Sequence, residues 1–204
     1  MKAPAPLRSL ITMDQLYTRT LTGSPIFQDG ELDQWLRGPA IEDQPLIKSL
    51  LSVVTEWGEG HTSLEFRANT WELLQSGVYG RSICLQRAPV STITSVTYTV
   101  EDDDPLTYNG TFAASNYYLK KGTSFSEVLL RPASSWMSDL DHQLEHNVKV
   151  IFTTSATQYL DIAKQAVKMH LLYLYENRGD VDVDSAARQS GAWDLYRQIT
   201  VIRI

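Results

Sequence analysis

YLDIAKQAVKMHLLYLYENR, residues 159–178, is the stretch on which the interpretation of the whole chain depends. It is long enough for about five helical turns. Its apolar side chains recur at helical spacing, at Ile162, Ala166, Met169 or His170, and Tyr173. Further apolar residues fill much of the remaining circumference, and such a helix is either buried or covered on a second face by another protein. We therefore predict a helix that forms the packing centre of the domain and keeps one face for a neighbour.

The composition predicts one globular domain that neither grips nucleic acid nor crosses a membrane. The chain has 204 residues, 43% of them apolar, and a formal net charge of -6. Tight binding of nucleic acid normally needs a clustered basic face. Asp161, Lys164 and Lys168 interrupt the long stretch, which falls short of the roughly 18 apolar residues that a membrane span needs.

The single cysteine and the N-terminus predict a protein made in a reducing cytoplasm. Cys84 has no second cysteine to pair with, and its place in an alternating apolar run predicts a small buried side chain rather than a nucleophile. The first residues, MKAPAPLRSLITM, lack the apolar core and cleavage site of a signal peptide. Two prolines and few anchoring side chains predict a flexible arm over 1–11.

Two further helices are predicted before a β-rich region. Thr12 and Gln15 have the spacing of a capping box, which predicts a short helix over about 12–20. An irregular excursion with several glycines and prolines follows at 21–40. Helical spacing returns at 43–58, with Gly58 and Gly60 expected to end the helix. Its apolar stripe contains Leu46, Leu50, Val53, Val54 and Trp57.

From 62 to 154 the hydrophobic period changes to two, which predicts strands. They span 66–74, 82–86, 92–100, 116–120, 127–131 and 147–153. Short turn signals separate them, so we expect an antiparallel meander. The whole predicts an α+β domain, in which N-terminal helices and the long C-terminal helix pack with this meander. The last residues, 198–204, alternate again and predict an extended tail that completes its own sheet or adds to another chain.

No catalytic or metal-binding constellation is recognisable, so we expect no enzyme activity, cofactor or metal. His142 and His146 are four residues apart, but the HExxH order is absent and a solvated loop is the preferred interpretation. His170 is expected to be a hydrogen-bonded core or interface residue. The acidic runs at 101–104 and 180–184 lack the spacing of a calcium loop and are expected to be exposed turns.

Several strings, in the same order, resemble the head–tail connector (adaptor) family of long-tailed bacteriophages and gene-transfer particles. The resemblance runs from about residue 12 to residue 197. It is carried by Thr12 to Gln15, the segment 43–62, Thr70 to Leu73, RAPVSTITSVTY at 87–98, Tyr118, Leu130, Pro132, Trp136, Val148, Val150, Phe152, YENR at 175–178, and Leu195-Tyr196-Arg197. The chain departs from the family pattern in its longer 21–40 excursion and in Leu195, where the family has proline.

This resemblance implies a structural protein of the virion neck, made in the cytoplasm of a bacterial host. It implies a homo-oligomeric ring, commonly twelvefold, with the portal protein above and a stopper or tail-terminator protein below. DNA would pass through the channel without specific binding, and no membrane would be involved. The implied division of the chain is a connector domain over 12–197 and a docking tail over 198–204.

Three groups of residues receive roles in this interpretation. The predicted ring interface contains Trp57, Met169, Leu171, Leu174, Tyr175 and Arg178. The predicted portal contact contains Arg197, Gln198, Ile199, Thr200, Val201, Ile202, Arg203 and Ile204. Carboxylates that would face the lumen and repel phosphates are Asp102, Asp103, Asp104, Asp180, Asp182 and Asp184.

Two other classes of function remain open. The chain could be a different neck or tail component, such as a stopper or tail terminator, but the long paired helices favour the adaptor over those mostly β proteins. It could also be a small enzyme or a carbohydrate-binding domain, since it has five tryptophans and ten tyrosines. Most of these aromatic residues fall at core-type positions, which argues against an exposed binding platform.

Overall fold

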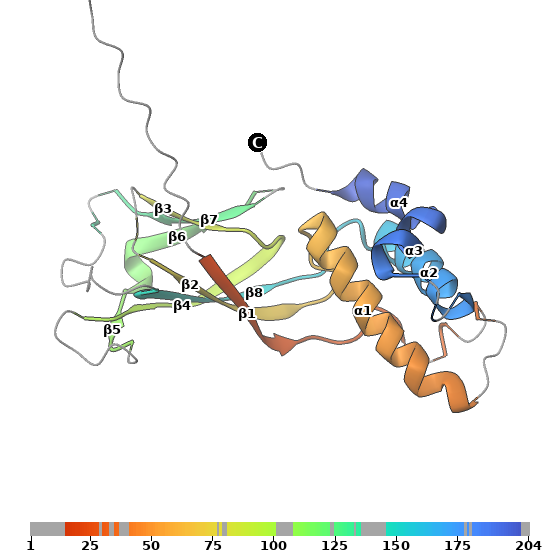
Figure 1. Cartoon of the computed structure of the whole chain (residues 1–204). Coiled ribbons are helices and arrows are strands. Elements are labelled where there is room, and N and C mark those ends of the chain that lie inside the picture. Colours follow the sequence, from red (N-terminus) through yellow and green to blue (C-terminus); the bar gives the residue numbers. More distant parts are fainter. Residues whose placement is uncertain are drawn as a thin grey trace, which may run out of the picture.

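The computed structural model has a strand lobe and a helical lobe, drawn at the left and right of Figure 1. It describes residues 15–28, 30–32, 35–36, 41–76, 78, 81–100, 108–122, 125–132, 134–135, 146–177, 179 and 181–200. The predicted arm at 1–11, the acidic residues 102–104, Trp136, His142, Arg178, Asp180 and the tail residues 201–204 lie outside these ranges.

A five-stranded antiparallel sheet forms one layer of the strand lobe, in the order β1-β2-β8-β4-β5. Its strands are β1 (Gln15–Thr22), β2 (Asn69–Gln75), β8 (Val148–Thr154), β4 (Val90–Tyr98) and β5 (Gly110–Thr111). Every second side chain of β2 and β8 is buried, as expected for strands with one face on a core.

A three-stranded antiparallel sheet, in the order β3-β7-β6, forms the second layer. Its strands are β3 (Ser82–Leu85), β7 (Ser126–Leu130) and β6 (Tyr117–Lys120), and a short 3-10 turn, η2 (Ala114–Asn116), leads into β6. The two sheets enclose an apolar core whose fully buried members include Leu73, Leu85, Val96, Val128 and Phe152.

The six strands predicted over 62–154 are present, but the predicted meander is wrong in its connections. β8, the last strand in the chain, lies between β2 and β4, so neither of its partners in the large sheet is its neighbour in sequence. A buried central position suits β8 because Val148, Val150 and Phe152 are all fully enclosed. Only β6 and β7 form the local hairpin that the turn signal at Lys121-Gly122 predicts.

The predicted N-terminal helix over 12–20 is wrong, because the described residues from Gln15 onward form strand β1. β1 pairs with β2 along its length, and its inward residue Tyr17 packs against the core of the strand lobe. Tertiary pairing thus outweighs the local capping pattern of Thr12 and Gln15. Cys84 is also misplaced by the sequence interpretation, since it lies on the exposed face of β3.

The helical lobe contains α1 (Gln44–Thr62), α2 (Leu160–Glu176), α3 (Val183–Gln189) and α4 (Ala192–Ile199), with a 3-10 turn, η1 (Ile41–Asp43), before α1. α2 lies within the predicted range 159–178. It packs against α1, α3 and α4 of its own chain, so the face that we expected a neighbour to cover is covered internally. His170, as predicted, is fully buried, and its Nε2 lies 2.7 Å from the Val183 carbonyl oxygen.

α1 runs four residues beyond its predicted end, to Thr62. Gly58 does not end the helix but permits a close contact: a Cβ there would lie 2.7 Å from Cε2 of Phe66 and 2.8 Å from Cε1 of Tyr196. The helix ends instead at Ser63, which adopts a left-handed conformation with φ of 59°.

The predicted extended tail begins too early, because Gln198 and Ile199 belong to helix α4. Ile199 is buried in the core of the helical lobe rather than available to a partner. Thr200 follows α4 in an extended conformation. The apolar residues Ala192, Tyr196 and Ile199 are spaced along one face of a helix, and this spacing is the physical reason that α4 forms.

Candidate assembly surface

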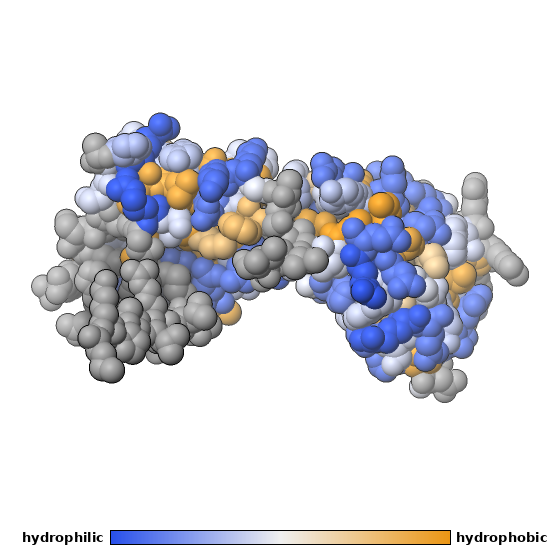
Figure 2. All heavy atoms as spheres, turned by 90° about the horizontal axis from the view of Figure 1, so that it is seen from above, coloured by the Kyte–Doolittle hydropathy of each residue, from blue (hydrophilic) through white to orange (hydrophobic). Residues whose placement is uncertain are grey.

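An apolar stripe on the outer face of α1 is the described surface best suited to contact another protein. Leu46 is 37% exposed and Val53 is 43% exposed, with half-buried Leu50 between them. Their spacing of four and three residues places the three side chains on one face. Seen from above in Figure 2, polar side chains cover most of the described surface, and apolar side chains gather in separate patches on both lobes.

The sequence predicted one apolar stripe on this helix, but the structure divides it between two faces. Val54 is fully buried and Ile47 nearly so, both facing the rest of the helical lobe. Leu46 and Val53 point outward instead. The division follows from α1 packing on α2 and α4 on one side only.

An aromatic group lies at the C-terminal end of the same stripe. Trp57 stacks on His61 with ring centroids 4.9 Å apart, and Trp193 of α4 lies 4.4 Å from the His61 ring. The Arg188 guanidinium sits 3.9 Å from the centroid of the Trp193 ring. Trp57, His61 and Trp193 are half-buried, and burial lowers the pKa of His61. Tryptophan and arginine are the residues enriched at interface hot spots.

The residues predicted for the ring interface occupy mixed positions. Leu171 and Leu174 are buried inside the protomer, so an aspartate at either position would disrupt folding instead of testing ring assembly. Met169 is half-buried, with its terminal methyl facing Gly191 between α3 and α4. The Tyr175 hydroxyl donates to the Asp43 carboxylate at 2.5 Å, which ties α2 to the start of α1.

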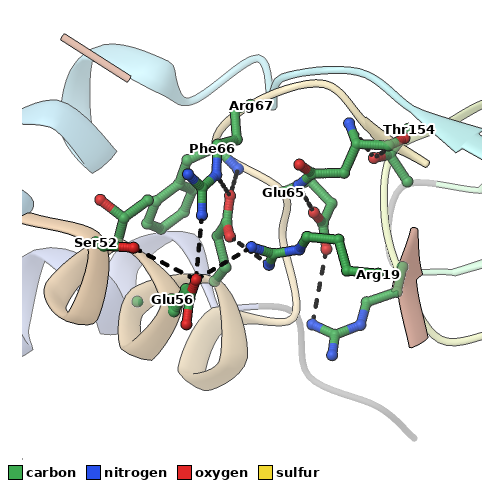
Figure 3. A network of polar contacts seen from close by, with 12 residues as sticks. Arg19, Ser52, Glu56, Glu65, Phe66, Arg67 and Thr154 are labelled. Atoms are coloured by element: carbon green, nitrogen blue, oxygen red, sulfur yellow. Dashed lines mark hydrogen bonds and ion pairs between the residues drawn. The ribbon is translucent and has the colours of Figure 1, made fainter. Parts of the chain in front are cut away.

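A buried network of charged residues joins the helical lobe to the strand lobe (Figure 3). Its centre is Glu59 of α1, which is fully buried. Arg19 of β1 donates to Glu59 at 2.9 Å, and Arg67 lies 3.5 Å from the same carboxylate. The backbone N–H of Phe66 donates to Glu59 at 3.1 Å. Glu56, which is exposed, lies 3.6 Å from Arg19 and 3.8 Å from Arg67.

Glu65 forms the second half of this junction. Its side chain is also fully buried, accepts a hydrogen bond from the Asn69 amide and lies 3.6 Å from Arg87. Burial, followed by the nearby Glu59 carboxylate, raises the pKa of Glu65 above its ordinary value. Arg87 and Arg19 both stack on the Trp71 ring, at 4.2 and 4.9 Å from its centroid.

This junction fixes how the two lobes are oriented, because its side chains come from α1, β1, β2, the 63–68 segment and the residues before β4. The sequence interpretation missed it. Its members lie up to 68 positions apart, and no local spacing connects Arg19 with Arg87. A buried ion pair is weak evidence for stability, but its directional contacts restrict the angle between the lobes.

The described members of the predicted acidic group lie on or beside α3, which the sequence interpretation took as a loop. Asp182 caps α3, with its carboxylate accepting from the Ser185 N–H at 2.9 Å and from the Ser185 hydroxyl. These hydrogen bonds lower the pKa of Asp182. Asp184 pairs with Arg188 at 2.9 Å. Both carboxylates are exposed. Of the predicted portal contact, Arg197 and Gln198 are exposed on α4.

Among the described residues, no group of three or more His, Cys, Asp or Glu side chains is arranged to hold a metal ion. None of the described helices has the length and apolar character to cross a membrane. A cavity of about 360 Å³ lies between α1 and the 25–32 segment. Its lining is mixed, with apolar Phe27, Ile47 and Leu51 and with the charged Lys48 and Arg67.

Comparison with known proteins identifies the fold. No protein-family model and no curated protein matches the chain. A chain of the virion of a native gene transfer agent (GTA) particle superimposes with a TM-score of 0.71, at 20% identity, over 93% of this chain and 97% of that chain. Chains of two GTA necks also superimpose on this chain, again over 93% of this chain and 97% of the neck chain. The neck of the native particle, computed with C12 symmetry, gives 0.68 at 19% identity, and that of the empty particle, computed with C6 symmetry, gives 0.73 at 20%.

Proposed function

We propose that this chain is a structural component of the neck of a phage-like particle, and specifically the adaptor ring that joins the portal to the rest of the neck. The supporting observation is that the fold matches chains of symmetric GTA necks over nearly the full length of this chain and of each neck chain. In this proposal the protein is not an enzyme and needs no cofactor.

The apolar stripe of α1 suits one side of a ring contact. A ring of identical chains needs a heterologous interface, in which two different surfaces of each subunit meet. Leu46, Leu50 and Val53 provide one apolar surface, and the aromatic group around Trp57 extends it. The buried junction at Glu59 and Glu65 would keep the two lobes at one angle, so that successive subunits close the ring at a fixed number.

The charges of the chain suit a channel for DNA. With a net charge of -6, the protein would repel phosphates rather than hold them. Asp182 and Asp184 are exposed on α3 and can face a lumen. For the portal contact, this proposal retains exposed Arg197 and Gln198 together with residues 200–204, whereas Ile199 supports the fold of α4.

The first experiment is to measure the mass of the purified protein alone and after mixing with portal-bearing capsids. We expect a stoichiometric ring at the portal vertex. If the protein ignores the portal but binds isolated tails, it belongs further down the neck, as a stopper or tail terminator would. If it binds neither, the neck proposal is wrong.

A substitution on α1 tests the ring surface. Val53→Asp should leave the fold intact, because the side chain is exposed, and should reduce ring formation by at least about tenfold, since a charge at an apolar interface is strongly unfavourable. Ser52→Asp is the matched control, because Ser52 is exposed on a different side of the same helix. Equal ring formation by the two variants would show that this face of α1 is not part of the ring interface.

A further inference from the structure

The strand lobe has two opposite flanks, each formed by one edge of both sheets. On the first flank β1 lies beside β3: the Tyr17 hydroxyl accepts from the Gln86 N–H at 2.9 Å and donates to the Cys84 carbonyl at 3.4 Å. On the second flank β5 lies beside β6, since Phe112, directly after β5, stacks on Tyr117 with centroids 5.8 Å apart. β1 and β5 are the opposite ends of one sheet, and β3 and β6 of the other.

The outer edge of β6 is open within the described part of the chain. Arg131 N donates to Asn116 O at 2.9 Å, at the start of β6. Hydrogen-bonded pairs alternate in an antiparallel ladder, so every second residue counted from Asn116 turns its backbone groups towards β7. Tyr117 and Leu119 therefore turn theirs outward, and no described residue pairs with them. An open strand edge is a template for another strand.

The other edge of the same sheet is covered. β3 presents the Cys84 carbonyl and the Gln86 N–H on its outer side, and side chains of β1 bond to both groups. Exposed apolar side chains also lie at the β6 flank, as Leu16 does on β1. Tyr118 is 42% exposed and Phe125, in the turn of the β6–β7 hairpin, is 40% exposed.

The chain itself supplies a segment that fits this edge. Residues 1–14 precede β1, and an extended chain of that length reaches about 46 Å. Within it, LRSLITM at 7–13 is uncharged apart from Arg8 and is largely apolar or β-branched. No glycine occurs from 7 to 18, so a two-residue hairpin turn that would fold the segment back onto its own β1 lacks the glycine that such turns favour.

We propose that residues 7–13 of one copy add as a strand to the outer edge of β6 in the next copy. The segment leaves the lobe from the β1 flank, and a head-to-tail ring places a different surface of the neighbour there. The β6 flank is that surface, with outward backbone groups of Tyr117 and Leu119 to bond and Tyr118 beside them to pack against. This inference rests on the proposed ring and identifies a contact that links successive subunits.

Disulfide trapping between two differently marked chains tests the pairing. Both carry Cys84→Ala; one also carries Ser9→Cys and the other Lys120→Cys, and they are mixed before assembly on portal-bearing capsids. Lys120 is exposed on β6. The matched control replaces Lys120→Cys by Thr18→Cys, which is exposed on β1. We expect an interchain disulfide with Lys120→Cys and none with Thr18→Cys.

The outcomes separate this inference from the proposed function. A complete ring that shows no Lys120→Cys disulfide overturns the strand exchange and leaves the adaptor proposal standing. An intrachain disulfide in a chain carrying both Ser9→Cys and Thr18→Cys also overturns it, because the segment then covers its own β1. Absence of any ring overturns both.

A backbone substitution tests the acceptor edge independently. Leu119→Pro removes one outward N–H without touching the β6–β7 ladder, and Leu119→Ala keeps that N–H with a similar loss of side chain. We expect ring formation to fall about tenfold in the proline variant relative to the alanine variant. Equal ring formation would contradict the pairing.

Discussion

The two lobes are held together by different kinds of packing. The core of the strand lobe consists of apolar and aromatic side chains that alternate along regular strands. The helical lobe instead buries a histidine, His170, and a tyrosine hydroxyl, Tyr196 Oη, and depends on close contact at Gly58. Between them lies a junction with two buried carboxylates, Glu59 and Glu65. The strand lobe also buries polar side chains, Gln75 and Ser126 among them, so what distinguishes its core is the regular alternation along its strands.

The largest effect is expected at the junction. Glu59→Gln keeps the shape of the side chain but leaves Arg19 and Arg67 without the buried negative charge, and breaking a buried pair on one side costs about 3–5 kcal/mol. Glu56→Gln is the control, since Glu56 is exposed and its removal should cost about 1 kcal/mol at most. Urea unfolding of both variants measures the difference. Similar losses would mean that the junction behaves as an ordinary surface network.

The second effect separates close packing from helix propensity. Alanine normally stabilises a helix interior relative to glycine by about 1 kcal/mol. At Gly58, a Cβ would collide with the Phe66 and Tyr196 rings, so Gly58→Ala should instead destabilise by about 1–3 kcal/mol. At Gly60, two residues on, nothing lies within 4 Å of such a Cβ, and Gly60→Ala should stabilise. Thermal unfolding of the two variants should shift in opposite directions; shifts of the same sign would show that the rings move aside easily.

The third effect is that the free energy of unfolding changes with pH in opposite directions because of two buried groups, His170 in the helical lobe and Glu65 in the junction. Burial lowers the pKa of His170 below 6.5, so the unfolded chain binds the proton first and stability falls as the pH drops through 6.5. Burial raises the pKa of Glu65 above 4.5, so the folded chain binds the proton first and stability falls as the pH rises above 4.5. His61 adds to the histidine effect, because its pKa is also lowered by burial.

Urea unfolding between pH 4 and 8 measures both slopes. His170→Gln should weaken the loss of stability below pH 6.5, and Glu65→Gln should weaken the opposing loss above pH 4.5. A variant whose slope matches that of the natural chain would show that the replaced group does not carry the effect.

The difference between the lobes also explains what the sequence could predict. A period of two located the strands of 62–154 to within a few residues, because alternation follows directly from the geometry of a half-buried sheet. The order of those strands could not be predicted, since it depends on β8 returning between β2 and β4. β1 was mistaken for a helix because Thr12 and Gln15 gave a local signal that pairing with β2 outweighs.

In the helical lobe, the sequence does contain patterns that predict α3 and α4, the two helices that the sequence interpretation missed. Asp182 and Ser185 have the spacing of a helix cap, and the apolar residues of α4 recur at helical spacing. Overlooking α3 and α4 left α2 with too much apolar surface, and that surface was then assigned to a neighbouring subunit. The junction had no such signal, because Arg19, Glu59 and Arg87 lie far apart in the sequence and come together only in the tertiary structure.

The smallest effect compares one hydroxyl in each lobe. Tyr196 Oη is buried and bonds to no described residue, and burial raises its pKa. Tyr196→Phe should therefore be neutral or stabilise by up to about 1 kcal/mol, because an unsatisfied polar group is removed. Tyr17→Phe should cost about 1 kcal/mol, because the Tyr17 hydroxyl accepts from Gln86 at 2.9 Å. Urea unfolding of the pair measures both signs. A clear loss of stability in Tyr196→Phe would show that this hydroxyl does make a stabilising hydrogen bond and would contradict the prediction.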